Sequence, residues 1–111
     1  MKEIEKKLNE FKQSVKIGLL NGTIKYTKRY RYNELTPYMD WFNVLFTIDK
    51  TDILISVGKY KEDVYCTKAG TLILSIHNDI LKDMFTKEEE QQFCEIVDNK
   101  PMDQPEVDEE I

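Results

Sequence analysis

The sequence predicts an α+β fold: an N-terminal helix, then an antiparallel sheet of four or five strands, then one or two C-terminal helices. Apolar residues recur at helical spacing in the first twenty residues, at a spacing of two between residues 24 and 76, and at helical spacing again after residue 79. Short polar turns separate the alternating segments, as in an antiparallel meander. We expect the helices to pack on one sheet face, which leaves the other face wet or available for binding.

The first segment is predicted to be an amphipathic helix. Its apolar side chains follow one another at spacings of four, three and four and therefore share one face: Ile4, Leu8, Phe11 and Val15. Asn21-Gly22 can end this helix, because glycine readily takes the left-handed conformation that follows a helix C-terminus. The same dipeptide is also a type I′ hairpin signal, and Val15, Ile17 and Leu19 alternate, so a hairpin is the competing interpretation.

The middle of the chain is predicted to form strands. Residues 24–32 alternate first, followed by residues 42–48, which give the clearest core strand. A tight polar turn at residues 49–52 leads to a third strand at residues 53–57, which Gly58 is expected to end. Val64–Thr67 and Thr71–Ile76 are expected to pair as a hairpin.

Helical spacing returns near the C-terminus. Apolar residues at positions 80, 81, 84 and 85 predict a short pair of turns, and Thr86 with Glu89 predicts a capping box that starts a further helix. Phe93, Ile96 and Val97 form the expected buried face of that helix. Beyond Asn99 the chain is proline-containing and acidic, so we expect one domain over residues 1–99 and a flexible acidic tail over residues 100–111.

Charge is unevenly divided along the chain. Residues 1–60 carry 11 Lys and Arg against 7 Asp and Glu, a net of +4, whereas residues 61–111 carry 5 against 14, a net of −9. The sequence pI is about 4.9. No apolar run approaches the ~18–20 residues that span a bilayer, and the N-terminus lacks a signal-peptide pattern. We therefore expect a cytoplasmic protein that does not enter a membrane.

No motif indicates catalysis or metal binding. Cys66 and Cys94 lack metal or redox spacing and are expected to be reduced, mostly buried thiols, with a disulfide as the alternative. His77 is expected to make a local hydrogen bond at a strand end, rather than to join a Cys–His nucleophile or a zinc site. We expect a protein that is not an enzyme and uses no cofactor or metal.

The segment from residue 25 to residue 31 is the candidate nucleic-acid-binding element. Basic and aromatic residues interleaved on a strand can hold phosphates and stack bases. The low pI and the small number of positive charges oppose this interpretation. The other interpretations are a charged strand that protects a sheet edge and a contact with an acidic protein surface, including this chain's own tail. The candidate residues are Lys25, Lys28, Arg29 and Arg31.

Trp41 and Leu45 are the first candidates for protein binding. They alternate with Phe42, Val44 and Phe46 and should lie on the sheet face that the helices leave open. An exposed aromatic and aliphatic patch commonly anchors an interface, and the alternative is a small core under the loop at residues 33–37. Acidic side chains suited to a basic partner surface complete the candidate set: Glu88, Glu89, Glu90, Asp108, Glu109 and Glu110. For the three glutamates at the helix start, the plainer interpretation is that they complement the helix dipole.

These features predict a small acidic protein-binding module that regulates or inhibits a larger cytoplasmic protein. A phage or mobile-element anti-defence protein, such as an anti-CRISPR that blocks a nucleic-acid-binding nuclease, belongs to this class, and so does an immunity protein. The alternative function is nucleic-acid binding through residues 25–31. An exposed sheet face or edge strand could equally form a homo-oligomer.

Overall fold

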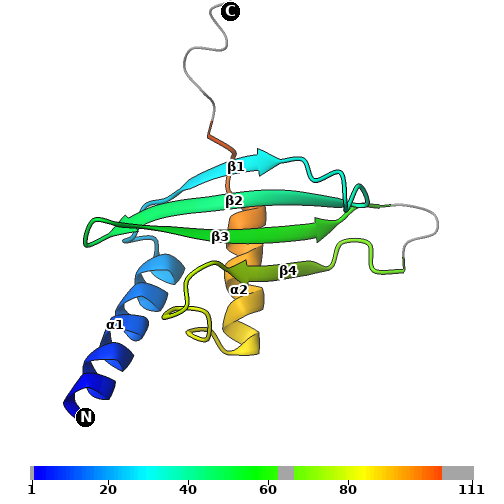
Figure 1. The fold of residues 1–111 in the computed structure, drawn as a ribbon. Helices are drawn as coiled ribbons and strands as arrows, with labels where there is room; N and C mark the ends of the chain where they lie inside the picture. Colours follow the sequence, from blue (N-terminus) through cyan, green and yellow to red (C-terminus); the bar gives the residue numbers. More distant parts are fainter. Residues whose placement is uncertain (1, 63–66, 104–111) are drawn as a thin grey trace, which may run out of the picture.

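The computed structural model describes residues 2–62 and 67–103. Its elements follow in the order α1 (Lys2–Asn21), β1 (Thr27–Arg31), β2 (Met39–Ile48), β3 (Thr51–Tyr60), β4 (Leu72–Ile76) and α2 (Lys87–Asn99). The strands form one antiparallel sheet in the order β1-β2-β3-β4 (Figure 1). The predicted α+β class is therefore confirmed, with four strands and one C-terminal helix in the described part of the chain.

Helix α1 forms as predicted and ends where the sequence indicates. Gly22 has a φ of +84°, and the Asn21 side chain accepts a hydrogen bond from the amide of Thr23 at 2.9 Å. The competing hairpin at Asn21-Gly22 is therefore wrong. The apolar stripe is buried only towards its C-terminal end, since Ile4 is 62% exposed while Val15 is 2% exposed. The N-terminal half of α1 extends beyond the sheet (Figure 1).

The meander is tightest between β2 and β3. These strands are joined by Asp49 and Lys50, whose φ angles of 48° and 68° match the two positive angles of a type I′ turn. β3 does not end at Gly58, as the sequence suggested, but continues to Tyr60. The glycine is needed in mid-strand because a Cβ there would lie 2.8 Å from Cε of Met39 and 2.9 Å from Cζ3 of Trp41.

The last strand pairs with β3 along Ile55–Lys59. Of the predicted Val64–Thr67 strand, residues 64–66 lie outside the described residues, and Thr67 is in a turn. Residues 79–83 are likewise turns, although Leu81 and Met84 are buried as their pattern indicated.

Helix α2 begins with the predicted capping box. The hydroxyl of Thr86 accepts from the amide of Glu89 at 3.2 Å, and the Glu89 carboxylate accepts from the amide of Thr86 at 2.9 Å. Phe93 and Val97 are fully buried, Ile96 is half-buried, and Cys94 is buried beside them.

The molecule has two layers. Val15 and Leu19 of α1, together with Phe93 and Val97 of α2, share one core with the sheet side chains at Val44, Phe46, Ile53, Ile55 and Val57. Both helices therefore cover the same sheet face, as predicted. The opposite face, which carries Trp41 and Leu45, contributes no residue to this core. We call it the open face.

Candidate functional site

The open face is built by strand alternation and register. Every second residue of each strand points to it, and the pairing of the strands aligns these residues in rows. Two rows with large apolar side chains flank a polar one. The first apolar row consists of Arg31, Trp41, Gly58 and Ile73. The polar row consists of Arg29, Asn43, Ser56 and Ser75. The second apolar row consists of Thr27, Leu45 and Leu54, and His77 lies beside Leu54.

Trp41 is the most constrained side chain of this face. Its indole Nε1 donates a hydrogen bond to Oγ1 of Thr36 at 2.8 Å, and the missing side chain of Gly58 leaves room for its ring. The Arg31 guanidinium lies 5.6 Å from the ring centre, within cation–π range. Trp41 is therefore half-buried and contacts the loop at residues 33–37, while it still lies on the open face.

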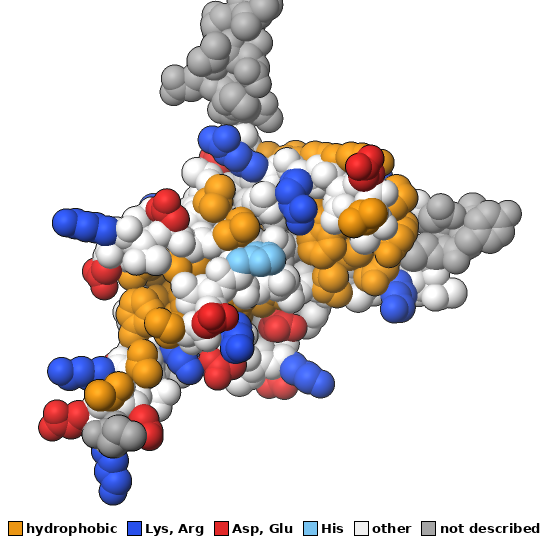
Figure 2. All heavy atoms as spheres, in the orientation of Figure 1, with side chains coloured by type: hydrophobic (Ala, Val, Ile, Leu, Met, Phe, Trp, Pro, Cys, Tyr) orange, Lys and Arg blue, Asp and Glu red, His pale blue; other side chains and the backbone are white. Residues whose placement is uncertain are grey.

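Aliphatic side chains extend the patch. Leu45 is 38% exposed and Ile73 is 36% exposed, and Leu54 is half-buried beside Leu45 in the second apolar row. Figure 2 shows hydrophobic side chains gathered over the sheet on both sides of the single histidine. Leu54 and Ile73 were not among the predicted site residues. Extending the alternation of β3 and β4 would have found them, because each lies between two residues that point to the core.

Basic residues border the β1 side of this patch, whereas the exposed Asp52 lies on the open face near Leu54 and accepts a hydrogen bond from the Thr47 hydroxyl. Arg29 and Arg31 are exposed on the open face, and Lys25 is exposed in the segment before β1. Lys28 points the other way and is only 3% exposed. The candidate nucleic-acid-binding set is thus divided, with three cations at the surface and one in the interior.

Lys28 instead fastens the end of the chain to β1. Its Nζ donates to the carbonyl oxygens of Asp98 at 3.2 Å and Lys100 at 2.7 Å, and it lies 4.4 Å from the centre of the Phe42 ring. Its backbone amide donates to Oδ2 of Asp103 at 2.7 Å, and its carbonyl accepts from the Asp103 amide at 3.0 Å. Burial lowers the pKa of Lys28, while the Asp98 carboxylate acts in the opposite direction.

These contacts also bear on the predicted tail. Residues 100–103 lie against β1 through Lys28, so this part of the tail is attached to the domain. The prediction for the remainder, including Asp108, Glu109 and Glu110, lies outside the described residues.

The acidic residues of α2 belong to the other layer. Glu88 is exposed, but Glu89 is committed to the capping box and to an ion pair with Lys16 at 3.1 Å. Hydrogen bonds from the Thr86 amide and the Lys16 ammonium lower the pKa of Glu89. Since α2 covers the face opposite Trp41 and Leu45, the sheet separates the glutamates from the aromatic patch. The structure does not bring these two parts of the predicted site together.

His77 and Cys94, whose side chains are suited to catalysis, each contact neighbouring residues of the fold. Nε2 of His77 lies 3.0 Å from the hydroxyl of Ser56, which agrees with the predicted local hydrogen bond. Burial, with a contribution from Glu90 and Glu95, raises the pKa of Cys94 to about 12, which suppresses its thiolate at neutral pH. Cys66 lies outside the described residues. Within residues 2–62 and 67–103, no three His, Cys, Asp or Glu side chains gather as a metal site would require, and no helix is long and apolar enough to cross a membrane.

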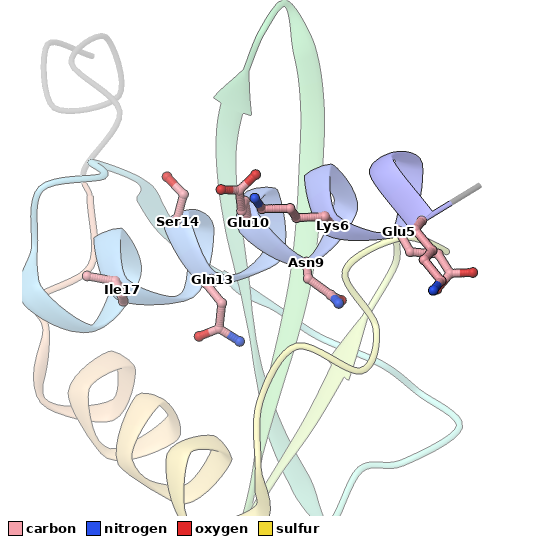
Figure 3. Close-up of a pocket in the computed structure, with 8 residues that line it drawn as sticks. Glu5, Lys6, Asn9, Glu10, Gln13, Ser14 and Ile17 are labelled. Atoms are coloured by element: carbon pink, nitrogen blue, oxygen red, sulfur yellow. The ribbon is translucent and has the colours of Figure 1, made fainter.

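A hollow of about 630 Å³ lies along α1, but a single helix lines it. Figure 3 shows that its labelled side chains all come from α1, with Lys6 and Glu10 lying close to each other. Because its lining residues all belong to this one helix, the hollow could contact a ligand from one side only. Its lining residues are Lys2, Glu5, Lys6, Asn9, Glu10, Gln13, Ser14 and Ile17.

A second, polar hollow of about 590 Å³ lies between the sheet and α2. Its cations are already neutralised, because Lys59 pairs with Asp98 at 3.2 Å and Lys61 pairs with Asp40 at 3.9 Å. Both lysines among its lining residues are therefore already paired with carboxylates and are poorly suited to bind an anionic ligand.

No protein family, curated protein or solved structure matched this chain. The function therefore has to be inferred from the chemistry of the open face.

Proposed function

We propose that the chain is a non-enzymatic protein-binding module whose open sheet face is the binding surface. The observation that carries this proposal is the patch formed by the half-buried Trp41 and the exposed Leu45 and Ile73 on the face that lies outside the core. Tryptophan is among the residues most often found at the energetic centre of a protein interface. A role as regulator or inhibitor of a larger cytoplasmic protein fits this small rigid surface.

The charges around the patch define the partner that would suit it. Arg29 and Arg31 line one side of the open face, and arginine forms strong paired hydrogen bonds with carboxylates. A partner of this face should therefore present acidic groups beside an apolar projection. A partner with a basic surface would instead have to contact α2 on the opposite layer.

Quantitative capture with matched variants tests the proposal. Leu45→Glu places a charge in the patch at an exposed position, whereas Gln92→Glu places the same charge on the exposed surface of α2. Wild type and Gln92→Glu should retain a stoichiometric protein that Leu45→Glu loses, with the same circular dichroism for all three. Absence of a stoichiometric protein in every sample, or equal loss in both variants, would contradict the proposal.

Nucleic-acid binding is the alternative, because Arg29 and Arg31 lie on the open face and Arg31 stands beside the ring of Trp41 on the neighbouring strand. With Lys28 buried, three surface cations remain, and three phosphate contacts give a log–log salt slope of roughly −2 to −3. A gel shift at low salt should then show retention that Arg29→Ala reduces. No retention at low salt would eliminate this alternative.

A further inference from the structure

The two edges of the sheet differ in their protection. β1 carries Lys28, Arg29 and Arg31, and its Lys28 backbone is covered by Asp103. Charged residues and covering segments are the usual means of preventing an edge strand from pairing with another chain. β4 reads Leu-Ile-Leu-Ser-Ile, without a charge, a proline or a glycine. Within residues 2–62 and 67–103, β4 thus lacks the charged residues and the covering segment that protect β1, apart from the side chain of Gln91 near Leu72.

The register shows which groups β4 presents at its outer edge. The amide of His77 donates to the carbonyl of Leu54, and the amide of Tyr60 donates to the carbonyl of Thr71, so the odd-numbered residues of this segment bond to β3. Leu72, Leu74 and Ile76 consequently direct their amides and carbonyls away from the sheet.

Little in the described chain occupies these groups. The Leu72 carbonyl accepts a bond of 3.3 Å from Nε2 of Gln91. The amides and carbonyls of Leu74 and Ile76, which point away from β3, have no hydrogen-bond partner within residues 2–62 and 67–103. The exposed edge therefore offers two adjacent sets of backbone donors and acceptors.

We propose that β4 pairs antiparallel with β4 of a second copy of this chain, about a two-fold axis at Leu74. In this register Leu74 faces its own counterpart, and Leu72 faces Ile76 of the other copy, so the three outward-directed residues meet as hydrogen-bonded pairs. The result is one continuous sheet that runs through both molecules.

The side chains suit a second copy better than a charged strand. On the helix-covered face the pairs are apolar, Leu74 with Leu74 and Leu72 with Ile76, and both Leu74 and Ile76 are only half-buried in the single chain. On the open face Ile73 meets Ser75. No like charges oppose one another across the axis, and apolar cross-strand pairs are favourable.

Mass measurement with a pair of lysine variants tests this proposal. Sedimentation equilibrium should show the mass rising with concentration from 13.2 kDa towards twice that value. Ser75→Lys puts two like charges diagonally across the axis and should weaken association by about two- to fivefold. Thr27→Lys adds the same charge to the open face at the β1 edge and should leave association unchanged.

Amide exchange supplies a second, residue-level result. At high concentration the amides of Leu74 and Ile76 should exchange more slowly than at low concentration, whereas that of Tyr30 on the β1 edge should not change. A mass that remains at 13.2 kDa up to about 1 mM would overturn the proposal. A dimer that Thr27→Lys disrupts and Ser75→Lys leaves intact would also overturn it, because it would place the contact at the other edge.

Discussion

The Lys28→Met variant tests how the C-terminus is fastened to the sheet. Methionine is an unbranched apolar side chain that can fill the space beside Phe42, so the variant removes the ammonium and its cation–π contact with that ring without leaving a large gap. The carbonyls of Asp98 and Lys100 then lose their donor. These carbonyls lie at the C-terminal end of α2, whose last turn contains no basic residue, so Lys28 is also the cation that complements the helix dipole there.

The magnitude follows from these contacts. An acceptor left without a partner costs about 1–3 kcal/mol, and the low end applies because Asp98 and Lys100 are half-buried and water can reach them. The variant also recovers the desolvation cost of burying an ammonium. Two acceptors at the low end give about 2 kcal/mol, and the recovered desolvation reduces this sum, so we expect a net loss of about 1 kcal/mol in the free energy of unfolding at neutral pH, or roughly 4 °C in Tm.

Urea unfolding at neutral pH is the assay, with Lys25→Met as the control. Lys25 is exposed before β1, so its replacement should change the free energy of unfolding by less than about 0.5 kcal/mol. The pH dependence has a defined sign: the pKa of Lys28 is lowered from 10.5 in the folded state, so the unfolded chain binds more protons just below that pH. The advantage of wild type over Lys28→Met should therefore increase as pH rises towards 10.5. If Lys28→Met is as stable as Lys25→Met, Lys28 does not hold α2 to β1.

Three further predictions concern Cys94, Asp103 and Gly58. Because the pKa of Cys94 is raised from 9.0 to about 12, the folded state keeps a proton that the unfolded chain releases, so above pH 9 the free energy of unfolding should fall by up to about 1.4 kcal/mol per pH unit relative to Cys94→Ala. Parallel pH profiles of wild type and Cys94→Ala would contradict the burial of this thiol. Asp103→Ala should cost about 1 kcal/mol and accelerate amide exchange at Lys28, and an unchanged exchange rate would show that the contact is not maintained in solution. Gly58→Ala should displace the Trp41 ring, shift its fluorescence and cost about 1–3 kcal/mol, and an unshifted spectrum would mean that the two positions are not in contact.

Elements whose physical cause lies in residues close together in sequence were predictable from the sequence. The alternation of Phe42, Val44 and Phe46 identified β2 and its buried face, because strand geometry sends successive side chains to opposite sides. Thr86 and Glu89 identified the start of α2, because a capping box satisfies backbone amides within a single turn. In both cases the physical cause lies within four residues of the signal.

The errors and omissions have long-range causes. Gly58 resembled a strand end, but its absent side chain makes room for Trp41 on the neighbouring strand. The burial of Lys28 follows from carbonyls about 70 residues away in sequence. The stripe of α1 predicted a buried helix, yet Ile4 and Leu8 lie beyond the sheet, since periodicity identifies a face but not how much of it finds a partner.

In the folded chain, exposed basic residues and exposed acidic residues lie on different layers of the molecule. The exposed Arg29 and Arg31 lie on the open face with Trp41, whereas the exposed Glu88 and Glu95 lie on α2, on the other side of the sheet. A flat partner on the open face therefore meets arginines and the aromatic patch without meeting the glutamates. Pairing through β4 would extend that face across the dimer and give it two copies of the patch, so a bivalent acidic partner would gain from effective concentration. Ser75→Lys should weaken the association of the copies while it leaves Trp41 and both arginines in place, so a bivalent partner should lose more affinity than a monovalent one, which meets only the local change on the open face.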